Sequence, residues 1–318
     1  MSNLHVPAAS HAGSRMRNIA AAMAGSARPG GHAQQVQYQF AEVQGHRVFY
    51  RDAGAKDAPV VLLLHGFPTS SHMFRNLIPE LSQRYRVIAP DLPGFGFTVS
   101  PAAFEHTFAH LAAVTDEFME LLSIRRYAVY VFDYGAPVGF RMALKHPDRI
   151  TGWITQNGNA YEEGLGSGFD LIRQYGRDPS PEHRAALKAI LTPDSIKQQY
   201  MDGVTDTSRI APESYFLDAT LVARPGNEEI QLDYFLDYRN NLAMYPDFQN
   251  YFRTSRPPLL AVWGKNDTIF VPAGAEAFKR DLPDAEVRLY GTGHFALETH
   301  VKEIGAAMRG FLGRKVQG

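Results

Sequence analysis

Three polar side chains with complementary chemistry stand far apart in this sequence, each directly after an apolar run. Asp133 follows "RYAVYVF", Asp267 lies in "WGKND", and His294 lies in "GTGHFALETH" after "EVRLY". A carboxylate is already an anionic nucleophile at neutral pH, and a histidine oriented by a second carboxylate can act as a general base. The order nucleophile, acid, histidine, with each residue at the end of a predicted strand, is typical of a hydrolytic triad.

The stretch "VFDYGAPVGF" surrounds Asp133 and predicts a sharp turn from a strand to a helix. Gly135 would let the helix pack close to the strand, and a strained turn would present Asp133 at the carboxyl edge of a sheet. An aspartate here could also simply cap the helix, and Asp267 could be an ordinary turn residue. His300, on the next predicted helix, is the less informative histidine. The shared order of the three residues favours catalysis.

The stretch "LLLHGFPTSSHMF" predicts a backbone donor beside this turn. Its strand should neighbour the strand that leads to Asp133, and the N–H of Phe67 would form an oxyanion hole with that of Tyr134. We expect His65, Gly66 and Pro68 to support the turn. We also expect a cis peptide bond between Phe67 and Pro68, because cis-proline is usually kept in tight functional turns.

Strands and helices alternate along most of the chain, which predicts an α/β fold with a doubly wound, mostly parallel sheet. A hairpin is expected at 36–52 around Gly45. Further strands are expected at 58–65, 85–91, 126–132, 150–158, 258–263 and 286–290, and helices at 70–83, 110–124, 135–146, 273–281 and 299–313. Residues 160–252 contain helical pieces and no buried strand. We therefore expect a core of residues 36–159 and 253–318, interrupted by a helical lid at 160–252.

Composition narrows the classes of partner and cofactor. The net charge is -1 and no apolar run approaches the ~20 residues that span a bilayer, so neither nucleic acid nor a membrane span is expected. The absence of cysteine excludes thiol catalysis and zinc–thiolate sites. Residues 1–35, rich in Ala, Gly and Ser, predict a disordered leader, with a weak export signal from Met16 as the alternative. We expect a cytoplasmic protein unless that signal acts; the sequence leaves the oligomeric state open.

Five motifs together resemble the α/β-hydrolases of the epoxide hydrolase and haloalkane dehalogenase group. They are "HGFPTSS", "DLPGFGF", "VFDYGAPVGF", "WGKND" and "TGHFALE", and the resemblance spans roughly residues 36–315. It implies that Asp133 is a nucleophile that forms an alkyl ester, that His294 activates water, and that Asp267 orients His294. It also implies a small apolar substrate, water as the second reactant, and neither cofactor nor metal.

The leaving group separates the members of this group. Haloalkane dehalogenases usually hold the halide with a Trp after the nucleophile and an Asn or Trp at the third position of HGxP. Those positions are Tyr134 and Phe67 here, and the only tryptophans, Trp153 and Trp263, fall in predicted strands. The usual halide site is therefore missing.

Epoxide hydrolases instead protonate the leaving oxygen with tyrosines of the lid. The stretch "LDYRNN" resembles the sequence around one such tyrosine and points to Tyr238, with Tyr234 one helical turn earlier on the same face. Epoxide hydrolases also usually have Trp after the nucleophile, so Tyr134 departs from both families.

The sequence therefore predicts an enzyme that opens epoxides to vicinal diols, with haloalkane hydrolysis as the alternative. The stretch "RMALKHPD" resembles haloacetate dehalogenases, but the positions of their carboxylate-binding arginines are Tyr134 and Pro137 here. A hydrolase fold that only binds a small ligand is a remote alternative.

Overall fold

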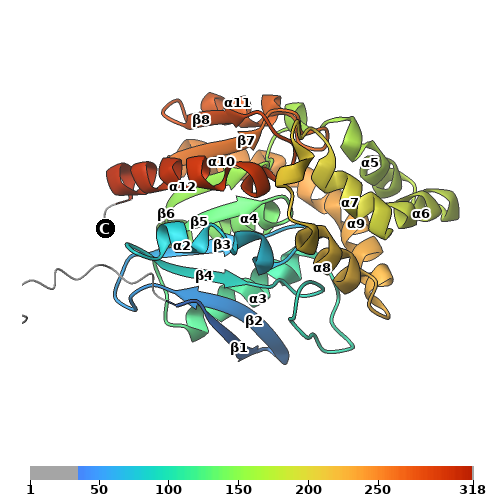
Figure 1. The fold of residues 1–318 in the computed structure, drawn as a ribbon, viewed down its shortest axis with the longest axis horizontal. Coiled ribbons are helices and arrows are strands. Elements are labelled where there is room, and N and C mark those ends of the chain that lie inside the picture. Colours follow the sequence, from blue (N-terminus) through green and yellow to red (C-terminus); the bar gives the residue numbers. More distant parts are fainter. Residues whose placement is uncertain (1–34, 317–318) are drawn as a thin grey trace, which may run out of the picture. The chain divides into compact units, whose positions relative to one another are not determined.

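The computed structural model describes residues 35–316, so the expected leader lies outside the described residues except for Gln35. Eight strands form one sheet in the order β1-β2-β4-β3-β5-β6-β7-β8 (Figure 1). β1 pairs with β2 and β2 with β4 in antiparallel fashion, and all other neighbours are parallel. The strands are Gln37–Val43, His46–Ala53, Val60–Leu64, Arg86–Pro90, Tyr127–Phe132, Ile150–Gln156, Leu259–Gly264 and Glu286–Tyr290, numbered β1 to β8. The predicted doubly wound, mostly parallel sheet is confirmed.

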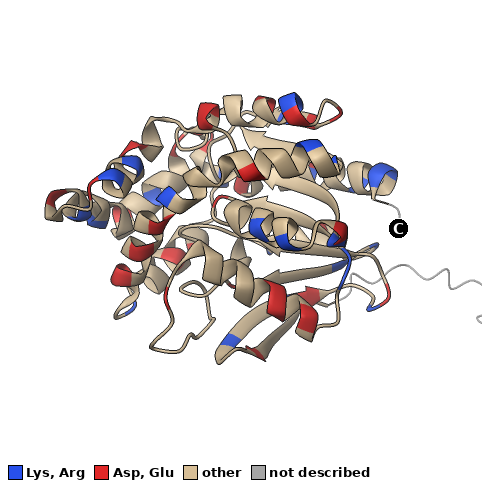
Figure 2. Cartoon of the chain, turned by 180° about the vertical axis from the view of Figure 1, so that it is seen from behind, with Lys and Arg blue, Asp and Glu red and all other residues tan. Residues whose placement is uncertain are grey.

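Helices cover both faces of this sheet. One face is covered by α2 (Ile78–Leu81) and α12 (Ala296–Lys315), and the other by α3 (Phe108–Leu121), α4 (Gly135–Lys145), α10 (Tyr245–Ser255) and α11 (Pro272–Asp281) (Figure 1). Along the ribbon, the positions of basic and acidic residues are interspersed rather than gathered by sign (Figure 2).

Alternate residues of the central strands fill the two layers between sheet and helices. In β3, Leu62 and Leu64 pack into one layer, whereas Val61 and Leu63 pack into the other. All four side chains are fully buried. A parallel strand with a helix layer on each face has no solvent side, which explains why its sequence is continuously apolar.

The first hairpin turns at Gln44 and Gly45, both of which have positive φ (49° and 82°), as a two-residue turn between antiparallel strands requires. The continuous helix predicted at 70–83 is wrong. The chain forms a short 3-10 turn at Ser71–Phe74 and then α2. The Ser70 hydroxyl caps the first turn, and Pro79, within the first turn of α2, has no N–H with which to continue a preceding helix.

Between β6 and β7 the described elements are all helical. We call residues 160–252 the helical insertion; its helices α5 to α9 lie beyond the carboxyl ends of the parallel strands (Figure 1). Its α-helices before α10 are α5 (Asp170–Arg177), α6 (Pro181–Lys188), α7 (Pro193–Met201), α8 (Pro212–Val222) and α9 (Asn227–Ala243). Short 3-10 turns occur at Glu162–Gly164, Ser167–Phe169, Ala189–Leu191 and Thr207–Arg209, and one more precedes β6 at Pro147–Arg149. Within residues 35–316, no helix combines the length and apolarity needed to cross a bilayer.

Candidate active site

Asp133 occupies the tip of the turn between β5 and α4. Its φ is 47°, a left-handed conformation that is strained for a residue with a side chain. The turn is tight because a Cβ on Gly135 would lie 2.4 Å from the carbonyl oxygen of Leu64. The residue that caps α4 is Tyr134, and no side chain caps this helix. Asp133 is therefore held in a strained turn without serving as the helix cap.

The HGFP turn supplies a donor to this carboxylate. The N–H of Phe67 donates to Oδ1 of Asp133 at 2.7 Å. The Phe67–Pro68 peptide bond is cis, as predicted. A Cβ on Gly66 would lie 2.3 Å from Oδ1 of Asp133 and 2.6 Å from the nitrogen of Tyr134, so only glycine allows this approach. Oδ1 thus lies between the turn and the start of α4.

His65 supports the turn from inside the protein. Its Nε2 accepts from the N–H of Leu92 at 2.9 Å, and its Nδ1 lies 3.1 Å from the carbonyl oxygen of Gly66. These partners require a neutral ring with the proton on Nδ1. Burial lowers the pKa of His65, which keeps the ring neutral. His65 therefore fixes the backbone that carries the Phe67 donor.

His294 and Asp267 meet as the sequence predicts. Nδ1 of His294 lies 2.7 Å from Oδ2 of Asp267. The same carboxylate accepts from Nδ2 of Asn157 at 2.7 Å and, through Oδ1, from the N–H of Ile269 at 2.8 Å. Asp267 thus accepts from three donors, and the proton of His294 stays on Nδ1. Nε2 of His294 is then free to accept a proton.

The three residues form one connected arrangement. Nε2 of His294 lies 3.9 Å from Oδ2 of Asp133, beyond a direct hydrogen bond. Burial raises the pKa of Asp133 to about 6, against the lowering effects of His294 and of the N–H groups of Phe67 and Tyr134. Burial opposes charge on His294, but Asp267 and then Asp133 outweigh it and raise its pKa. A buried carboxylate and an imidazole are thus held side by side without being hydrogen-bonded to each other.

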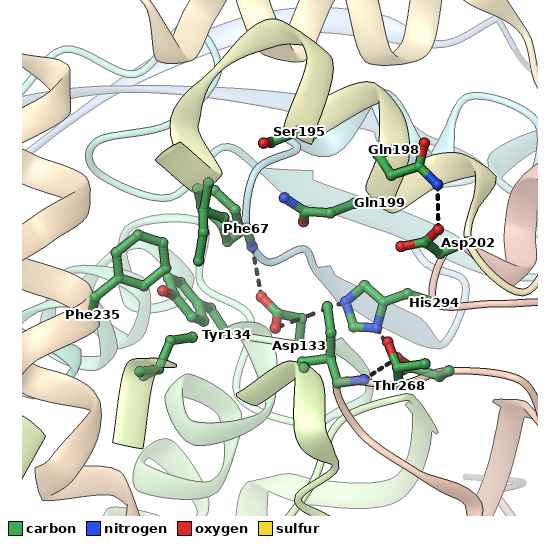
Figure 3. A pocket seen from close by; sticks show the side chains of 15 residues that line it. Phe67, Asp133, Tyr134, Ser195, Gln198, Gln199, Asp202, Phe235, Thr268 and His294 are labelled. Carbon is green, nitrogen blue, oxygen red and sulfur yellow. Dashed lines mark hydrogen bonds and ion pairs between the residues drawn. The ribbon is translucent and has the colours of Figure 1, made fainter. Parts of the chain in front are cut away.

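A cavity of about 250 Å³ opens above Asp133 and His294 (Figure 3). The side chains from the insertion and loops that line it fall into two groups. The apolar group contains Phe67, Tyr134, Ile172, Ile190, Phe235 and Ile269. The polar group comes from α7 and the residue after it, and contains Ser195, Gln198, Gln199 and Asp202. The cavity therefore suits a small molecule with a largely apolar body.

The tyrosines singled out in the sequence differ in their surroundings. The hydroxyl of Tyr234 donates to the carbonyl oxygen of Pro93 at 2.9 Å, so this proton is already committed. The hydroxyl of Tyr134 is buried and has no partner, whereas the buried hydroxyl of Tyr238 lies beside that of Tyr245. Their rings are 5.8 Å apart, but only Tyr134 lines the cavity. Tyr234 and Tyr238 do share one face of α9, since both contact Phe108.

Both tryptophans lie in the core, as predicted, and their indole N–H groups are used there. Trp153 donates to the hydroxyl of Tyr251 at 3.2 Å, and Trp263 donates to the carbonyl oxygen of Phe270 at 2.7 Å. Neither lines the cavity. Among residues 35–316, no group of three or more His, Asp or Glu side chains is placed to hold a metal ion.

Two polar residues of the site were not expected from the sequence. Asn157 directly follows β6 with φ 45° and also accepts from the N–H of Gly264 at 2.9 Å through Oδ1. The "QNGN" stretch at the carboxyl end of a predicted strand could have indicated it. Gln199 reaches the cavity from α7, and nothing in the local sequence distinguishes it from Gln198.

A strained strand-to-helix turn with a nucleophilic side chain, a carboxylate-bound histidine and backbone donors define a hydrolase of the α/β class. The α/β hydrolase fold family matches residues 59–301. The chain belongs to this family and is an α/β-fold hydrolase. It is 50% identical over 265 residues to an uncharacterized hydrolase of Saccharomyces cerevisiae, which covers 82% of this chain and 91% of the relative.

Other relatives carry more specific names. A haloalkane dehalogenase of Mesorhizobium japonicum is 27% identical over 284 residues, 83% of this chain and 87% of the relative. The solved structure of DbjA has a TM-score of 0.75 at 24% identity and covers 88% of this chain and 97% of its own. The epoxide hydrolase VrEH1 of Vigna radiata has a TM-score of 0.70 at 23% identity and covers 88% of this chain and 98% of its own. The structural similarities establish the fold, and the predicted resemblance to the epoxide hydrolase and haloalkane dehalogenase group is confirmed.

Proposed function

We propose that this hydrolase opens epoxides to vicinal diols through an alkyl ester on Asp133. The observation that carries the proposal is that the two oxygens of the Asp133 carboxylate have different surroundings. Oδ1 is held by the N–H of Phe67, whereas Oδ2 faces His294 across 3.9 Å. A carboxylate with one fixed oxygen and one free oxygen, beside a base that does not bind it directly, suits attack on saturated carbon followed by hydrolysis.

In the first step, Oδ2 of Asp133 would attack an epoxide carbon. A C–O bond forms to Asp133 while the C–O bond of the ring breaks, and its electron pair goes to the leaving oxygen. That oxygen must take a proton from an acid in the site. The product is a neutral ester whose carbonyl oxygen is Oδ1.

In the second step, His294 would take a proton from water, and the hydroxide would attack the carbonyl carbon of the ester. Asp267 holds the His294 ring through Nδ1, so Nε2 is the atom that accepts the proton. Negative charge then develops on Oδ1, where the N–H groups of Phe67 and Tyr134 would stabilise it. When this intermediate collapses, the C–O bond to the diol breaks and the diol oxygen takes the proton held by His294. The proton left on the Asp133 carboxyl returns to the phenolate formed in the first step, which restores the ionised carboxylate and the acid.

The leaving-group side of the cavity supports an epoxide better than a halide. Both tryptophan N–H groups are engaged in the core, so neither is available to a halide. The buried hydroxyls of Tyr134, which is unpaired, and of Tyr238 are donors of the kind that an alkoxide needs. Burial raises the pKa of both phenols well above its ordinary value, which keeps them protonated. We propose that Tyr134, which lines the cavity, protonates the leaving oxygen, that Tyr238 supports it from behind the cavity wall, and that Tyr234 has a packing role.

Carbon–halogen hydrolysis is the second candidate. The observation that favours it is the similarity to curated haloalkane dehalogenases, such as the one from Mesorhizobium japonicum over 83% of this chain. The first step would use the same Oδ2 of Asp133, and the second step would be identical. Only the donors around the leaving group would differ.

We propose that the helical insertion acts as a lid over this chemistry. Its residues Ile172, Ile190 and Phe235 form much of the apolar wall, and α7 forms the polar wall. A lid of this kind would set the size of the substrate and limit the access of water to the ester.

The experiment that tests this proposal traps the ester. The variant His294→Gln lacks the imidazole that would activate water, so the ester should accumulate. We expect incubation with a small terminal epoxide to add the mass of one epoxide to the peptide that contains Asp133. An adduct from haloalkanes alone would transfer the assignment to the second candidate, and no adduct from either would refute the ester mechanism.

The same trapped adduct identifies the acid. We expect Tyr134→Phe, added to His294→Gln, to slow adduct formation about 10²- to 10⁴-fold, the usual contribution of general acid catalysis, and Tyr238→Phe to slow it less, because Tyr238 does not line the cavity. Tyr234→Phe is the matched control, because its hydroxyl is bonded to Pro93. If the control slows the reaction as much as Tyr134→Phe, no tyrosine can be assigned as the acid.

A further inference from the structure

Two buried polar groups on the cavity wall have no hydrogen-bond partner. They are the hydroxyl of Tyr134 and Nε2 of Gln199. A buried donor left unpaired costs about 1–3 kcal/mol, so native proteins keep few of them and usually for a reason. No other residue that lines this cavity carries such a group. Both donors are therefore available to form a hydrogen bond with a molecule that enters the cavity.

Gln199 is directed into the cavity by its neighbours on α7. Gln198 donates from Nε2 to Oδ1 of Asp202, so its amide is already engaged. Tyr200 stacks on Phe295, with ring centroids 3.8 Å apart and an interplanar angle of 6°, and donates to Asp218 on α8. Phe295 directly follows His294 in the chain. The helix that carries Gln199 is thus anchored next to the general base.

The Gln199 amide lies where the reacting end of a substrate would lie, rather than where its apolar body would lie. In Figure 3, Gln199 extends from α7 into the space above Asp133, on the side of Phe67. In the same view, the labelled side chains of Tyr134 and Phe235 lie on the opposite side of Phe67 from Gln199 (Figure 3). A molecule attacked by Asp133 would lie between these two donors.

We propose that the Gln199 amide N–H binds the leaving oxygen of the substrate as Asp133 attacks. This inference rests on the proposed ester mechanism and adds a catalytic residue to it. An amide N–H donates a hydrogen bond but does not transfer its proton under these conditions, so the proton still comes from a phenol. The amide stabilises the charge that develops on oxygen before the proton arrives. The amide N–H, which has no partner in the free enzyme, thus gains a hydrogen-bond acceptor in the transition state.

The test measures the two chemical steps separately in Gln199→Met, a variant of similar length without a donor. In the His294→Gln background, we expect the rate of adduct formation on Asp133 with a terminal epoxide to fall about 10- to 100-fold, the loss expected for a hydrogen bond to a developing charge. In the enzyme that retains His294, we expect hydrolysis of the preformed ester to change less than about twofold, because the amide does not face that step.

Stability gives an independent readout. Because Gln199→Met removes an unpaired donor, we expect the melting temperature of the free enzyme to stay constant or rise. Gln174→Met on α5 is the matched control, since Gln174 is exposed and does not line the cavity. We expect it to leave adduct formation unchanged.

The outcomes separate the inference from the proposed function. Equal adduct rates for Gln199→Met and its parent refute the role of Gln199 and leave the ester mechanism standing. An equal loss in both chemical steps, together with a lower melting temperature, assigns Gln199 a structural role and also refutes the inference. If neither enzyme forms an adduct, the ester mechanism fails, and the inference fails with it.

Discussion

The side chain of Asp133 is buried, yet the proposed mechanism requires it to be ionised. Burial normally disfavours a charged carboxylate. Burial raises its pKa to about 6, so the charge survives at neutral pH only through nearby compensation. That compensation comes from His294 and from the N–H groups of Phe67 and Tyr134. A poorly hydrated carboxylate is a stronger nucleophile than an exposed one. The same raised pKa places a limit on the pH range in which Asp133 can react.

The rate of ester formation should therefore decrease at low pH, because protonation removes the nucleophilic carboxylate. Below about pH 6, Asp133 becomes protonated, and we expect the rate to fall about tenfold per pH unit. Above that value the rate should level off until another group titrates. Rapid-quench measurement of the Asp133 adduct between pH 4.5 and 8, at substrate saturation, checks this expectation.

The variant His294→Gln tests the cause of the compensation. Since His294 lowers the pKa of Asp133, its removal should move the midpoint of the profile to higher pH. A profile that stays flat down to pH 4.5 in the parent enzyme would contradict the burial argument. A midpoint that does not move in the variant would contradict the coupling between the two residues.

Ester formation should also change His294. In the free enzyme, Asp133 is one of the charges that raise the pKa of His294, after Asp267. The ester is neutral, so this contribution is lost once the substrate is attached. The base is then more readily neutral at the moment when it has to accept a proton from water. The chemistry of the first step thus prepares the second.

At the scale of elements, the sequence predicted most of what local patterns control. Continuous apolar runs identified the parallel strands, because a strand buried on both faces has no polar positions. The turn around Asp133 was predictable, because Gly135 and the small residue after it leave few other conformations. The helix at 70–83 was wrong although Met73, Leu77 and Leu81 are all buried, as the pattern required. Periodicity fixed which side chains face inward, but the serine cap and Pro79 decided the backbone.

The contact between α7 and α8 contains a carboxyl group that the proposed chemistry does not use. Oδ2 of Asp218 accepts from the hydroxyl of Tyr200 at 2.5 Å, and its Oδ1 has no partner. Burial raises the pKa of Asp218 to about 8, although the hydrogen bond from Tyr200 lowers it. Asp218 is thus protonated at neutral pH and joins the two helices as a neutral group.

This protonation should make the stability of the protein depend on pH. The folded pKa is above the unfolded one, so Asp218 stabilises the fold at low pH, and the contribution is lost as pH rises through about 8. We expect the free energy of unfolding of the parent minus that of Asp218→Asn to decrease by up to about 1.4 kcal/mol per pH unit between pH 6.5 and 8. Denaturant unfolding of both proteins across this range gives the difference directly.

The substitution Asp218→Asn keeps the shape and neutrality of the protonated acid, so the variant should fold at all these pH values. Asp284→Asn, an exposed position, serves as the control and should leave the pH dependence of the parent unchanged. A constant difference between parent and Asp218→Asn would show that Asp218 does not titrate in this range.

At the scale of the whole molecule, the site combines residues that are far apart in the sequence, from the HGFP turn at 65–68 to the loop of His294. Parallel strands bring their carboxyl ends to one edge, so the meeting of Asp133, Asp267 and His294 followed from the order of the strands. The helical insertion obeys no such rule, because its helices pack through contacts that local sequence does not reveal. Tyr238 was expected on the cavity wall, yet Tyr134 and Gln199 line it. The triad was therefore predictable, whereas the substrate wall needed the folded insertion.

The cavity between core and insertion should limit the size of the substrate. Ile172 on α5 lines the apolar wall, so Ile172→Ala should enlarge the space available to the substrate body. For a series of terminal epoxides with longer alkyl chains, we expect kcat/KM of the variant to rise relative to the parent by about fourfold for each methylene that enters the new space, equivalent to about 0.8 kcal/mol. The shortest epoxide should lose activity slightly, because it leaves part of the wall without contact. The neighbouring Leu171→Ala changes an exposed side chain and should preserve the parent's preference. The same change of preference in both variants, or none in Ile172→Ala, would mean that the insertion does not select the substrate by size.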